Sequence, residues 1–327
     1  MMNIEIVIQQ RGTGRTFDIS DLVSDINWST DMINAQPGAL DFEYIEDSNI
    51  IPHYGDFIRL RIDSRGVFFG RVFTKERSEL ATMRVRAYDL VRFLKNKHTY
   101  ALSTLNSTQI FRRICNDFEL AHRVVDASNY NLPAMVHDNE SLFNILQDAF
   151  DKTVTARREW FFVRDNFGVL EHVNINSQQT SLVIGDNSMA TGYEFTGSIA
   201  DDTFNRVRLV RENEATMRRE VYIVQDSRNI NTWGLLQFHD TVDEGLNTAQ
   251  IDARASLILA AKNRPTRELR ITALGDLRVR AGSGIVLMLD NLRNEGFSAK
   301  QRALVCSCVH RWSSAGHLME LTLRVVN

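Results

Sequence analysis

Residues 55–63 read Gly-Asp-Phe-Ile-Arg-Leu-Arg-Ile-Asp, and residues 282–290 read Gly-Ser-Gly-Ile-Val-Leu-Met-Leu-Asp. The two stretches share the opening glycine, the isoleucine at the fourth position, the leucine at the sixth, an aliphatic residue at the eighth and the closing aspartate. In the first stretch, apolar residues alternate with charged ones, which is the period of a β-strand with one buried and one exposed face. We therefore predict a strand after each glycine, once near either end of the chain.

Each stretch is followed by two further strand-like runs, and a serine turn separates the second run from the third. The runs are Val67–Phe73 and Met83–Ala87 around Ser78, and Ala303–Val309 and Met319–Val325 around Ser313–Ser314. A three-strand unit is thus predicted twice. Repeated β units stack and continue one another's edges, so the duplication favours an architectural role over a catalytic pocket.

The composition describes an ordinary soluble protein that can form two or three domains. The chain has 327 residues, of which 43% are hydrophobic and 24% charged, with a formal net charge of −3. No basic excess is available for neutralising nucleic-acid phosphates, and no apolar run approaches the roughly 20 residues of a membrane span. The N-terminus shows no signal-peptide pattern, and only three cysteines occur, so we expect synthesis in a reducing cytosol without disulfides.

Arginine greatly outnumbers lysine among the 38 basic residues. Arginine presents a planar donor fork to carboxylates and is enriched in protein interfaces, where lysine is depleted. The bias favours a protein that works in an assembly. An arginine-favouring genome would produce the same bias.

Changes in hydrophobic period divide the chain into three predicted parts. Residues 1–100 carry half a dozen short strands with Gly, Asp and Ser at the joints, which indicates a closed or nearly closed β-barrel. Residues 101–185 change to helical spacing and form an α/β insertion domain. Residues 186–327 return to β and are interrupted by a helical insertion at about 226–265. The fold class is therefore mainly β with α/β insertions.

Local signals mark the predicted helices. Ser107 is a candidate N-cap for a helix with apolar residues from Ile110 to Phe118, and a second helix from Leu142 is entered through Asn139 or Ser141. Asn247-Thr248-Ala249-Gln250 has the form of a capping box and opens a third helix, which stops near Pro265.

The sequence contains no convincing catalytic or metal-binding motif. Cys306, Cys308 and His310 share one face of a predicted strand and are candidate metal ligands, but a structural zinc site draws four ligands from two segments, so we interpret them as core residues. Cys115 lies on the apolar side of a helix, where a thiol is inert. We predict no catalytic, cofactor-binding or metal site.

Two other patterns also favour a structural interpretation. The acidic clusters Asp201-Asp202 and Glu43/Glu46/Asp47 are typical of turns, whereas glycoside hydrolysis needs two carboxylates that face each other across a cleft. Gly12-Thr13-Gly14 lacks the remaining glycine and the lysine of a phosphate-binding loop, and is predicted to be a hairpin turn.

Several segments, in order along the chain, resemble the tail baseplate hub proteins of bacteriophages and phage-like bacteriocins. The resemblance is to hubs of Gram-positive prophages, which are related to late-control protein D and to the hubs of contractile tails. It spans most of the chain, is clearest over 26–120, and rests on Asn27–Asp31, Pro37–Phe42, Gly55–Leu60, Ala87–Tyr100, Thr108–Cys115 and Gly275–Gly284.

The resemblance implies two tail-tube-type antiparallel β-barrels per chain joined by small α/β insertions. Three chains would form a homotrimeric ring of six barrels, which adapts a sixfold tail tube to a threefold central spike. It implies the tail tube, central spike, tape-measure and other baseplate proteins as partners, in a phage or bacteriocin particle assembled in the cytoplasm of the bacterial host. No enzymatic activity, cofactor, sequence-specific nucleic-acid binding or membrane insertion is expected.

Two alternatives stay open. The first is a baseplate-associated peptidoglycan hydrolase, although the two barrels and their insertions leave no room for an appended hydrolase domain. The second is a cell-wall-binding module, because Trp28, Trp160, Trp233 and Trp312 are aromatic side chains that can stack on sugars. Their scatter over separate segments favours core or interface positions instead.

Overall fold

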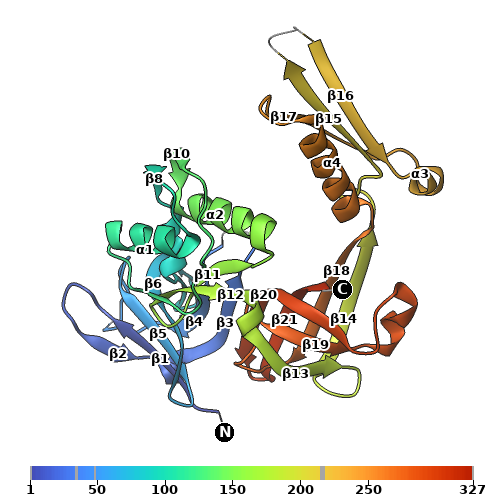
Figure 1. Ribbon diagram of the computed structural model, residues 1–327. Coiled ribbons are helices and arrows are strands. Elements are labelled where there is room, and N and C mark those ends of the chain that lie inside the picture. Colours follow the sequence, from blue (N-terminus) through green and yellow to red (C-terminus); the bar gives the residue numbers. More distant parts are fainter. Residues whose placement is uncertain (1, 34–35, 48, 214–217, 326–327) are drawn as a thin grey trace. The chain divides into compact units, whose positions relative to one another are not determined.

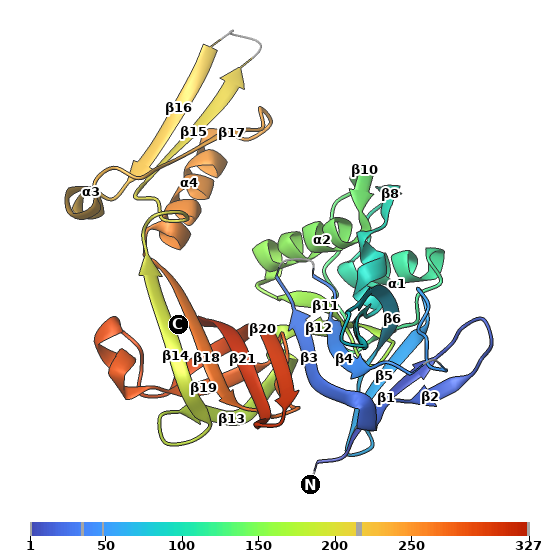
Figure 2. The ribbon, with the colours of Figure 1, turned by 180° about the vertical axis from the view of Figure 1, so that it is seen from behind.

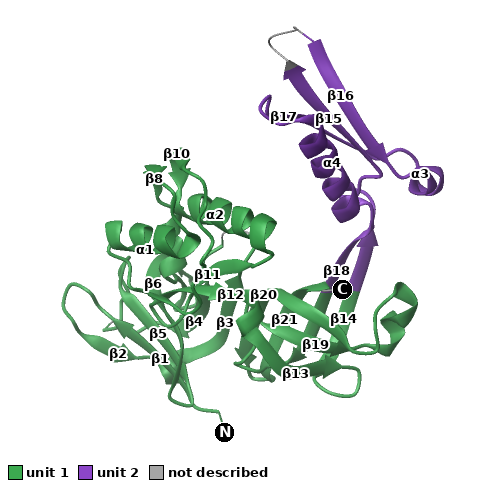
Figure 3. Ribbon diagram, viewed as in Figure 1, with its two compact units in different colours: residues 1–194, 270–327 green, residues 195–269 purple. Residues whose placement is uncertain are grey.

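The computed structural model describes residues 2–33, 36–47, 49–213 and 218–325 (Figure 1). The chain forms two compact units (Figure 3). Residues 1–194 and 270–327 make up the main unit, and residues 195–269 make up the inserted unit. Within the described ranges, no helix has both the length and the apolarity needed to cross a membrane.

The chain contains two β modules with the same strand order, and all of the first and most of the second lie in the main unit. In the first module the hydrogen-bonded order is β3-β4-β7-β6-β5-β1, with β2 at the outer edge of β1. In the second module it is β14-β18-β21-β20-β19-β13. The first module comprises β1 (Ile4–Gln9), β2 (Thr16–Asp18), β3 (Val23–Asp31), β4 (Ala39–Ile45), β5 (Phe57–Ile62), β6 (Arg65–Arg77) and β7 (Thr82–Tyr88). The second comprises β13 (Gln179–Gly185), β14 (Ala190–Ser198), β18 (Thr266–Leu274), β19 (Gly284–Met288), β20 (Gln301–Ser313) and β21 (Gly316–Val325).

The three-strand unit predicted from the sequence is confirmed in both modules. Strands β5, β6 and β7 pair antiparallel in sequence order, and so do β19, β20 and β21. The modules differ at their far ends, because β1 joins β5 antiparallel whereas β13 joins β19 parallel. Pairing among the described residues follows an open path, so closure of each module into a barrel stays a prediction.

The duplication extends to single hydrogen bonds. Gly55 and Gly282, which open the two repeats, have φ values of 86° and 87°, a conformation that glycine adopts without steric cost. Gly55 N–H donates to the Val72 carbonyl at 2.8 Å, and Gly282 N–H donates to the Val305 carbonyl at 2.8 Å. A register shift follows each acceptor, between Val72 and Thr74 in β6 and between Val305 and Ser307 in β20.

Strand alternation builds the core of the first module as the sequence predicts. Ile58, Leu60 and Ile62 of β5 are buried, while Arg59 and Arg61 lie between them on the other face. The buried side chains pack with aliphatic and aromatic residues from β1, β4, β6 and β7. An alternating strand of this kind separates a packed side from a charged side.

An α/β insertion follows the first module and has a core of its own. It comprises β8 (Lys97–Leu102), α1 (Ser107–Asp117), β9 (His122–Val124), β10 (Met135–Ser141), α2 (Leu142–Arg157), β11 (Phe161–Asp165) and β12 (Leu170–Asn174). Ser141 caps α2 as predicted. The predicted cap at Ser107 is wrong, because Asn106 accepts the Gln109 N–H and completes a capping box, while Ser107 is buried in the first turn. Short 3₁₀ helices lie at Ser20–Leu22, Leu90–Lys95, Ile175–Gln178 and Asp290–Glu295.

The inserted unit is a three-stranded sheet in the order β16-β15-β17 with one long helix packed against it. It comprises β15 (Arg206–Asn213), β16 (Arg218–Gln225), α3 (Ser227–Trp233), β17 (Gln237–Val242) and α4 (Thr248–Lys262). Ile251 and Ala255 of α4 pack on Val207, Leu209 and Val242. The predicted capping box is confirmed, with Asn247 and Gln250 each accepting from the other's backbone N–H.

Candidate functional site

The two modules of the main unit are joined by a backbone ladder between β3 and β20. The strands pair antiparallel from Asp31 opposite Ser307 to Ile26 opposite Trp312. Figures 1 and 2 show β3 (blue) beside β20 (red) from opposite sides. Strand β20 changes partner along its length, because Gln301–Leu304 pair with β19 and the residues from Ser307 onward pair with β3. The register shift at Cys306 marks this change, as expected of a bulge that ends one ladder and re-aims the strand.

Stacked aromatic rings fill this junction. Trp28 of β3 stacks on His310 of β20 with ring centroids 5.1 Å apart, and Trp312 stacks on His317 at 4.5 Å. Trp28 and Trp312 both belong to the core of the first module, so β20 supplies a side chain to the neighbouring module's core. Burial lowers the pKa of His310 to about 4, so its ring is neutral at neutral pH. Its Nε2–H then donates to the Val279 carbonyl at 2.8 Å, and its Nδ1 accepts from His317.

The tryptophans that suggested sugar binding are placed mainly for packing. Trp28 and Trp312 are 5% and 4% exposed in the junction. Trp160 packs beside Phe162 and Val173, with the Arg324 guanidinium over its ring, and Trp233 ends α3. Within the main unit, Trp160 packs in a different cluster from Trp28 and Trp312, so these three do not form a shared aromatic platform.

The candidate metal ligands on β20 contact backbone carbonyls. Cys308 Sγ lies 3.8 Å from the Val279 carbonyl oxygen, which also accepts from His310, whereas Cys306 Sγ lies 3.8 Å from that of Leu304. Burial raises the pKa of both thiols. Among the residues that the structure describes, no three His, Cys, Asp or Glu side chains gather as metal ligands.

Most of the other candidate residues have local partners or lie in turns. Glu43 pairs with Arg84 at 3.1 Å and Glu46 with Arg77 at 2.7 Å, while Asp47 accepts the Asn49 N–H in a turn. Asp202 pairs with Lys262, and Asp201 is exposed beside it. Burial raises the pKa of the Cys115 thiol to about 12, and Gly12-Thr13-Gly14 forms the predicted turn between β1 and β2. These carboxylates neutralise basic side chains or form turns, rather than facing each other across a cleft.

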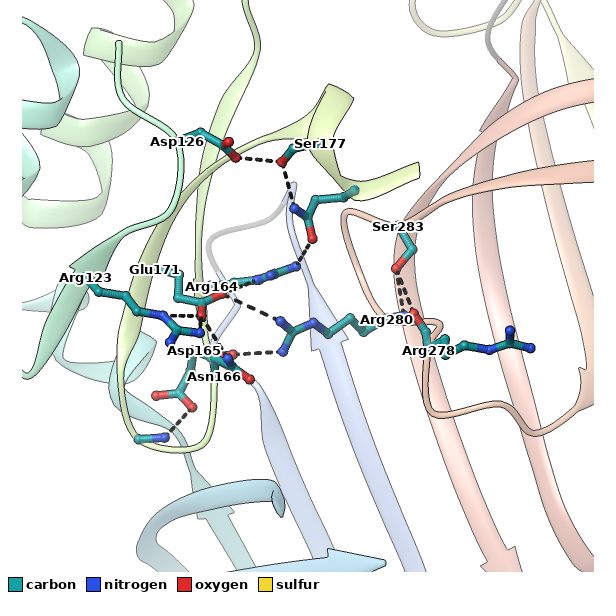
Figure 4. Close-up of polar contacts among 12 residues, drawn as sticks. Arg123, Asp126, Arg164, Asp165, Asn166, Glu171, Ser177, Arg278, Arg280 and Ser283 are labelled. Atoms are coloured by element: carbon teal, nitrogen blue, oxygen red, sulfur yellow. Dashed lines mark hydrogen bonds and ion pairs between the residues drawn. The ribbon is translucent and has the colours of Figure 1, made fainter. Parts of the chain in front are cut away.

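A buried ionic cluster, which the sequence did not predict, ties the α/β insertion to the second module (Figure 4). Glu171 of β12 is fully buried and accepts from Nε of Arg123 and from Nε of Arg164, both at 2.8 Å. Arg280, in the turn before β19, lies 3.7 Å from the same carboxylate. We call Arg123, Arg164, Glu171 and Arg280 the Glu171 cluster. Its members come from β9, β11, β12 and a loop more than 100 residues later, so no local spacing signals it.

The electrostatics of the cluster follow from burial and pairing. Burial alone would raise the pKa of Glu171, but hydrogen bonds from Arg164, Arg123 and Asn166 hold it below the ordinary value of a glutamate. Burial, reinforced by the neighbouring Arg164, lowers the pKa of Arg280 to about 10. Glu171 is therefore an anion that the guanidinium groups of Arg123, Arg164 and Arg280 stabilise. Of these, Arg164 and Arg280 are largely buried and need this anion as a partner, whereas Arg123 is also solvated.

Two aspartates, the buried Asp89 and the half-buried Asp165, lie beside the cluster. Asp89 accepts from the N–H groups of Gly38 and Val91, both at 3.0 Å, and caps the 3₁₀ helix Leu90–Lys95. Asp165 accepts from the Gly168 N–H at 2.9 Å and the Leu90 N–H at 3.4 Å. Burial raises the pKa of Asp165 to about 7, and burial together with the nearby Asp165 raises that of Asp89 well above its usual value.

A polar cavity of about 350 Å³ opens next to the Glu171 cluster. Four arginines line it, namely Arg65, Arg164, Arg278 and Arg280, and its other lining residues include no Asp or Glu. It lies where the first module, the α/β insertion and the second module meet.

The sequence matches a protein-family model and a curated bacterial protein. The family model described as YQBQ-like matches residues 26–324. The phage-like element PBSX protein XkdQ of Bacillus subtilis is 28% identical over 238 residues, which cover 72% of each chain.

Solved structures of tail proteins share the fold at low identity. The 43 kDa tail protein of prophage MuSo2 from Shewanella oneidensis matches with a TM-score of 0.71 at 14% identity, over 98% of both chains. A tail protein of Neisseria meningitidis MC58 matches with a TM-score of 0.71 at 12% identity, over 99% of this chain and 97% of that one.

Proposed function

The chain belongs to the YQBQ-like family of phage tail baseplate proteins, and from this premise we propose that it is the hub of the baseplate, three copies of which form a ring. A structural role in a phage tail baseplate is what this family membership supports. In the proposal, the ring adapts a sixfold tail tube to a threefold central spike. It acts by geometry and not by catalysis.

The duplication of the β module carries this proposal. One chain holds two modules of the same strand order, with matching glycines, hydrogen bonds and bulges. Three such chains present six similar modules, so they can match a sixfold ring on one side while keeping threefold symmetry on the other. The ladder between β3 and β20 supports the same reading, since it is a side-by-side contact of modules that a ring would repeat.

The proposed partners follow from that place in the tail. The tail tube protein would lie against the six modules, the spike against the threefold face, and the tape-measure protein and other baseplate components around the ring. The particle is a phage or bacteriocin tail assembled in the host cytoplasm.

The test is the oligomeric state and symmetry of the purified protein. Sedimentation should give the mass of three chains, and averaged electron micrographs should show a ring of six densities. A stable monomer that also fails to form rings when mixed with the tail tube protein would contradict the proposal. Digestion of purified peptidoglycan by the protein would contradict the non-catalytic role.

A further inference from the structure

The ladder between β3 and β20 uses one edge from each module, and the duplication supplies a second copy of each edge. The counterpart of β3 is β14, and the counterpart of β20 is β6. Among the described strands, β14 pairs only with β18. Strand β6 pairs with β5 up to Arg71 and, beyond the bulge, Thr74–Arg77 pair only with β7. The chain therefore carries one occupied edge pair and two complementary open edges.

Equivalent residues of the two modules differ in exposure where β3 pairs with the second module and no described strand pairs with the first. Ala281 in the second module is 4% exposed, and its N–H donates to Thr30 Oγ1 of β3 at 3.0 Å. Its counterpart in the first module, one residue before Gly55, is Tyr54, which is 68% exposed. The difference arises because β3 covers the turn before β19, whereas no described strand covers the turn before β5.

The same contrast holds along the strand itself. Cys308 and His310 lie two and four residues after the bulge at Cys306 of β20. Both are fully buried where β20 pairs with β3. In β6, the residues two and four positions after the bulge at Phe73 are Lys75 and Arg77, and the Arg77 side chain is 76% exposed. The matched side chains also reach the same backbone carbonyl. Lys75 Nζ donates to the Pro52 carbonyl, and Sγ of its counterpart Cys308 lies 3.8 Å from the Val279 carbonyl oxygen of the equivalent turn.

We propose that the edge of β6 beyond Phe73, residues Thr74–Arg77, receives β14 of a second copy of this chain in an antiparallel ladder. The inference rests on the proposed ring and names the contact that closes it. The part of β14 concerned is Tyr193–Ser198. The Gly275 N–H donates to the His317 carbonyl as the Glu46 N–H donates to the Ala81 carbonyl, and the Leu274 N–H donates to the Met189 carbonyl, so these residues stand where Ile26–Asp31 stand in β3. Glu194 on this strand and Lys75 and Arg77 on the receiving edge carry opposite charges, which favours the pairing over contact between two like edges.

This contact joins two different surfaces, so it repeats head to tail. Heterologous contacts of that kind close into a ring when the rotation per copy allows it, and otherwise grow into filaments. Charged residues on a free strand edge hinder indiscriminate pairing. Lys75 and Arg77 therefore protect the isolated chain while leaving the backbone groups of β6 available to the matching strand.

The test traps the ladder with disulfides between two copies. Single variants Lys75→Cys, Glu76→Cys and Arg77→Cys are mixed pairwise with Phe195→Cys, Thr196→Cys and Gly197→Cys, so that the different registers are sampled, and each mixture is oxidised. A disulfide needs Cα atoms within about 7 Å, so only neighbours across the ladder can be bridged. Mixing Thr196→Cys with Thr99→Cys, an exposed position on β8, is the control. The native cysteines are buried.

The inference expects a covalent dimer from at least one of the nine mixtures and none from the control. If the wild-type protein sediments as a trimer and no mixture cross-links above the control, the assignment of these edges is wrong and the ring stands. A chain that carries both members of the reactive pair should stop at three linked copies. Cross-linked products that continue beyond three would uphold the edges and contradict the ring of three.

Discussion

The carboxylate of Asp89 accepts a hydrogen bond from the backbone N–H of Gly38 at 3.0 Å, and the Asp89 N–H donates in return to the Gly38 carbonyl at 3.0 Å. The two residues lie 51 positions apart, in two of the segments that resemble phage tail hubs. The contact fixes the end of β7 and the start of the α/β insertion against the loop before β4. Glycine is required at position 38 because an added Cβ would lie 2.3 Å from Asp89 Oδ2.

Replacing Gly38 with alanine should therefore destabilise the main unit. The methyl group would displace a buried carboxylate from two backbone donors, at a cost of about 2–4 kcal/mol in the free energy of unfolding. Urea denaturation measures the effect. Gly12→Ala is the matched control, since a Cβ there meets no atom within 4 Å. Equal effects of the two substitutions would show that the contact between Gly38 and Asp89 does not constrain the fold.

Neutralising Glu171 should be more costly than neutralising an exposed glutamate. Glu171→Gln leaves Arg164 and Arg280 largely buried without their anion, and we expect a loss of about 3–5 kcal/mol in the free energy of unfolding. Glu212→Gln removes the partner of Arg219 in an exposed pair and should cost less than about 1 kcal/mol. Chemical denaturation of both variants at neutral pH decides the comparison, and a small loss for Glu171→Gln would show that the cluster contributes little.

Asp165 should make stability depend on pH. Its pKa is about 7 in the folded protein, against an ordinary value of 3.8 for an aspartate, so between these pH values the folded state holds a proton that the unfolded state has lost. This contribution is fully present below pH 3.8 and is lost as the pH rises through about 7. Asp165→Asn cannot titrate, so relative to the wild type it should lose about 2 kcal/mol more at pH 5 than at pH 8.

The measurement is urea denaturation of wild type and variant at both pH values. Asp21→Asn, at an exposed position, is the control and should show the same difference from wild type at pH 5 and pH 8. A constant difference for Asp165→Asn as well would mean that Asp165 is ionised throughout this range in the folded protein.

The inserted unit should be dispensable for folding of the main unit. Thr266 Oγ1 donates to the Ser198 carbonyl at 3.0 Å, so the ends of β14 and β18 lie within reach of a short turn. Replacing residues 199–265 with a Gly-Ser turn should leave the denaturation midpoint of the main unit within experimental error, because the two units have separate cores. Removing residues 103–174 instead should abolish folding, since this deletion removes the Glu171 cluster and Asp165. Loss of folding in the first deletion would contradict the division into two units.

The features that were predicted correctly depend on residues that are close together in the sequence. The alternation of Ile58, Leu60 and Ile62 with arginines, the cap at Ser141 and the box from Asn247 to Gln250 each involve residues within a few positions of one another. The repeat that begins at Gly55 and at Gly282 was readable for the same reason. The hydrophobic period of a strand and the cap of a helix are properties of a short segment, so they can be recognised in the amino-acid sequence of that segment.

Contacts between segments far apart in the sequence could not be predicted and were seen only in the tertiary structure. Glu171 meets Arg280 from 109 positions away, and Asp89 shares its buried site with Asp165 from the other side of the α/β insertion. The ladder between β3 and β20 is made of backbone groups, which every residue except proline carries alike, so no side-chain pattern announces it. The sequence determined that a β module occurs twice, because hydrophobic period is local. Only the folded chain decided which edges of the modules meet and which stay open, because strand pairing depends on where the backbone lies in space.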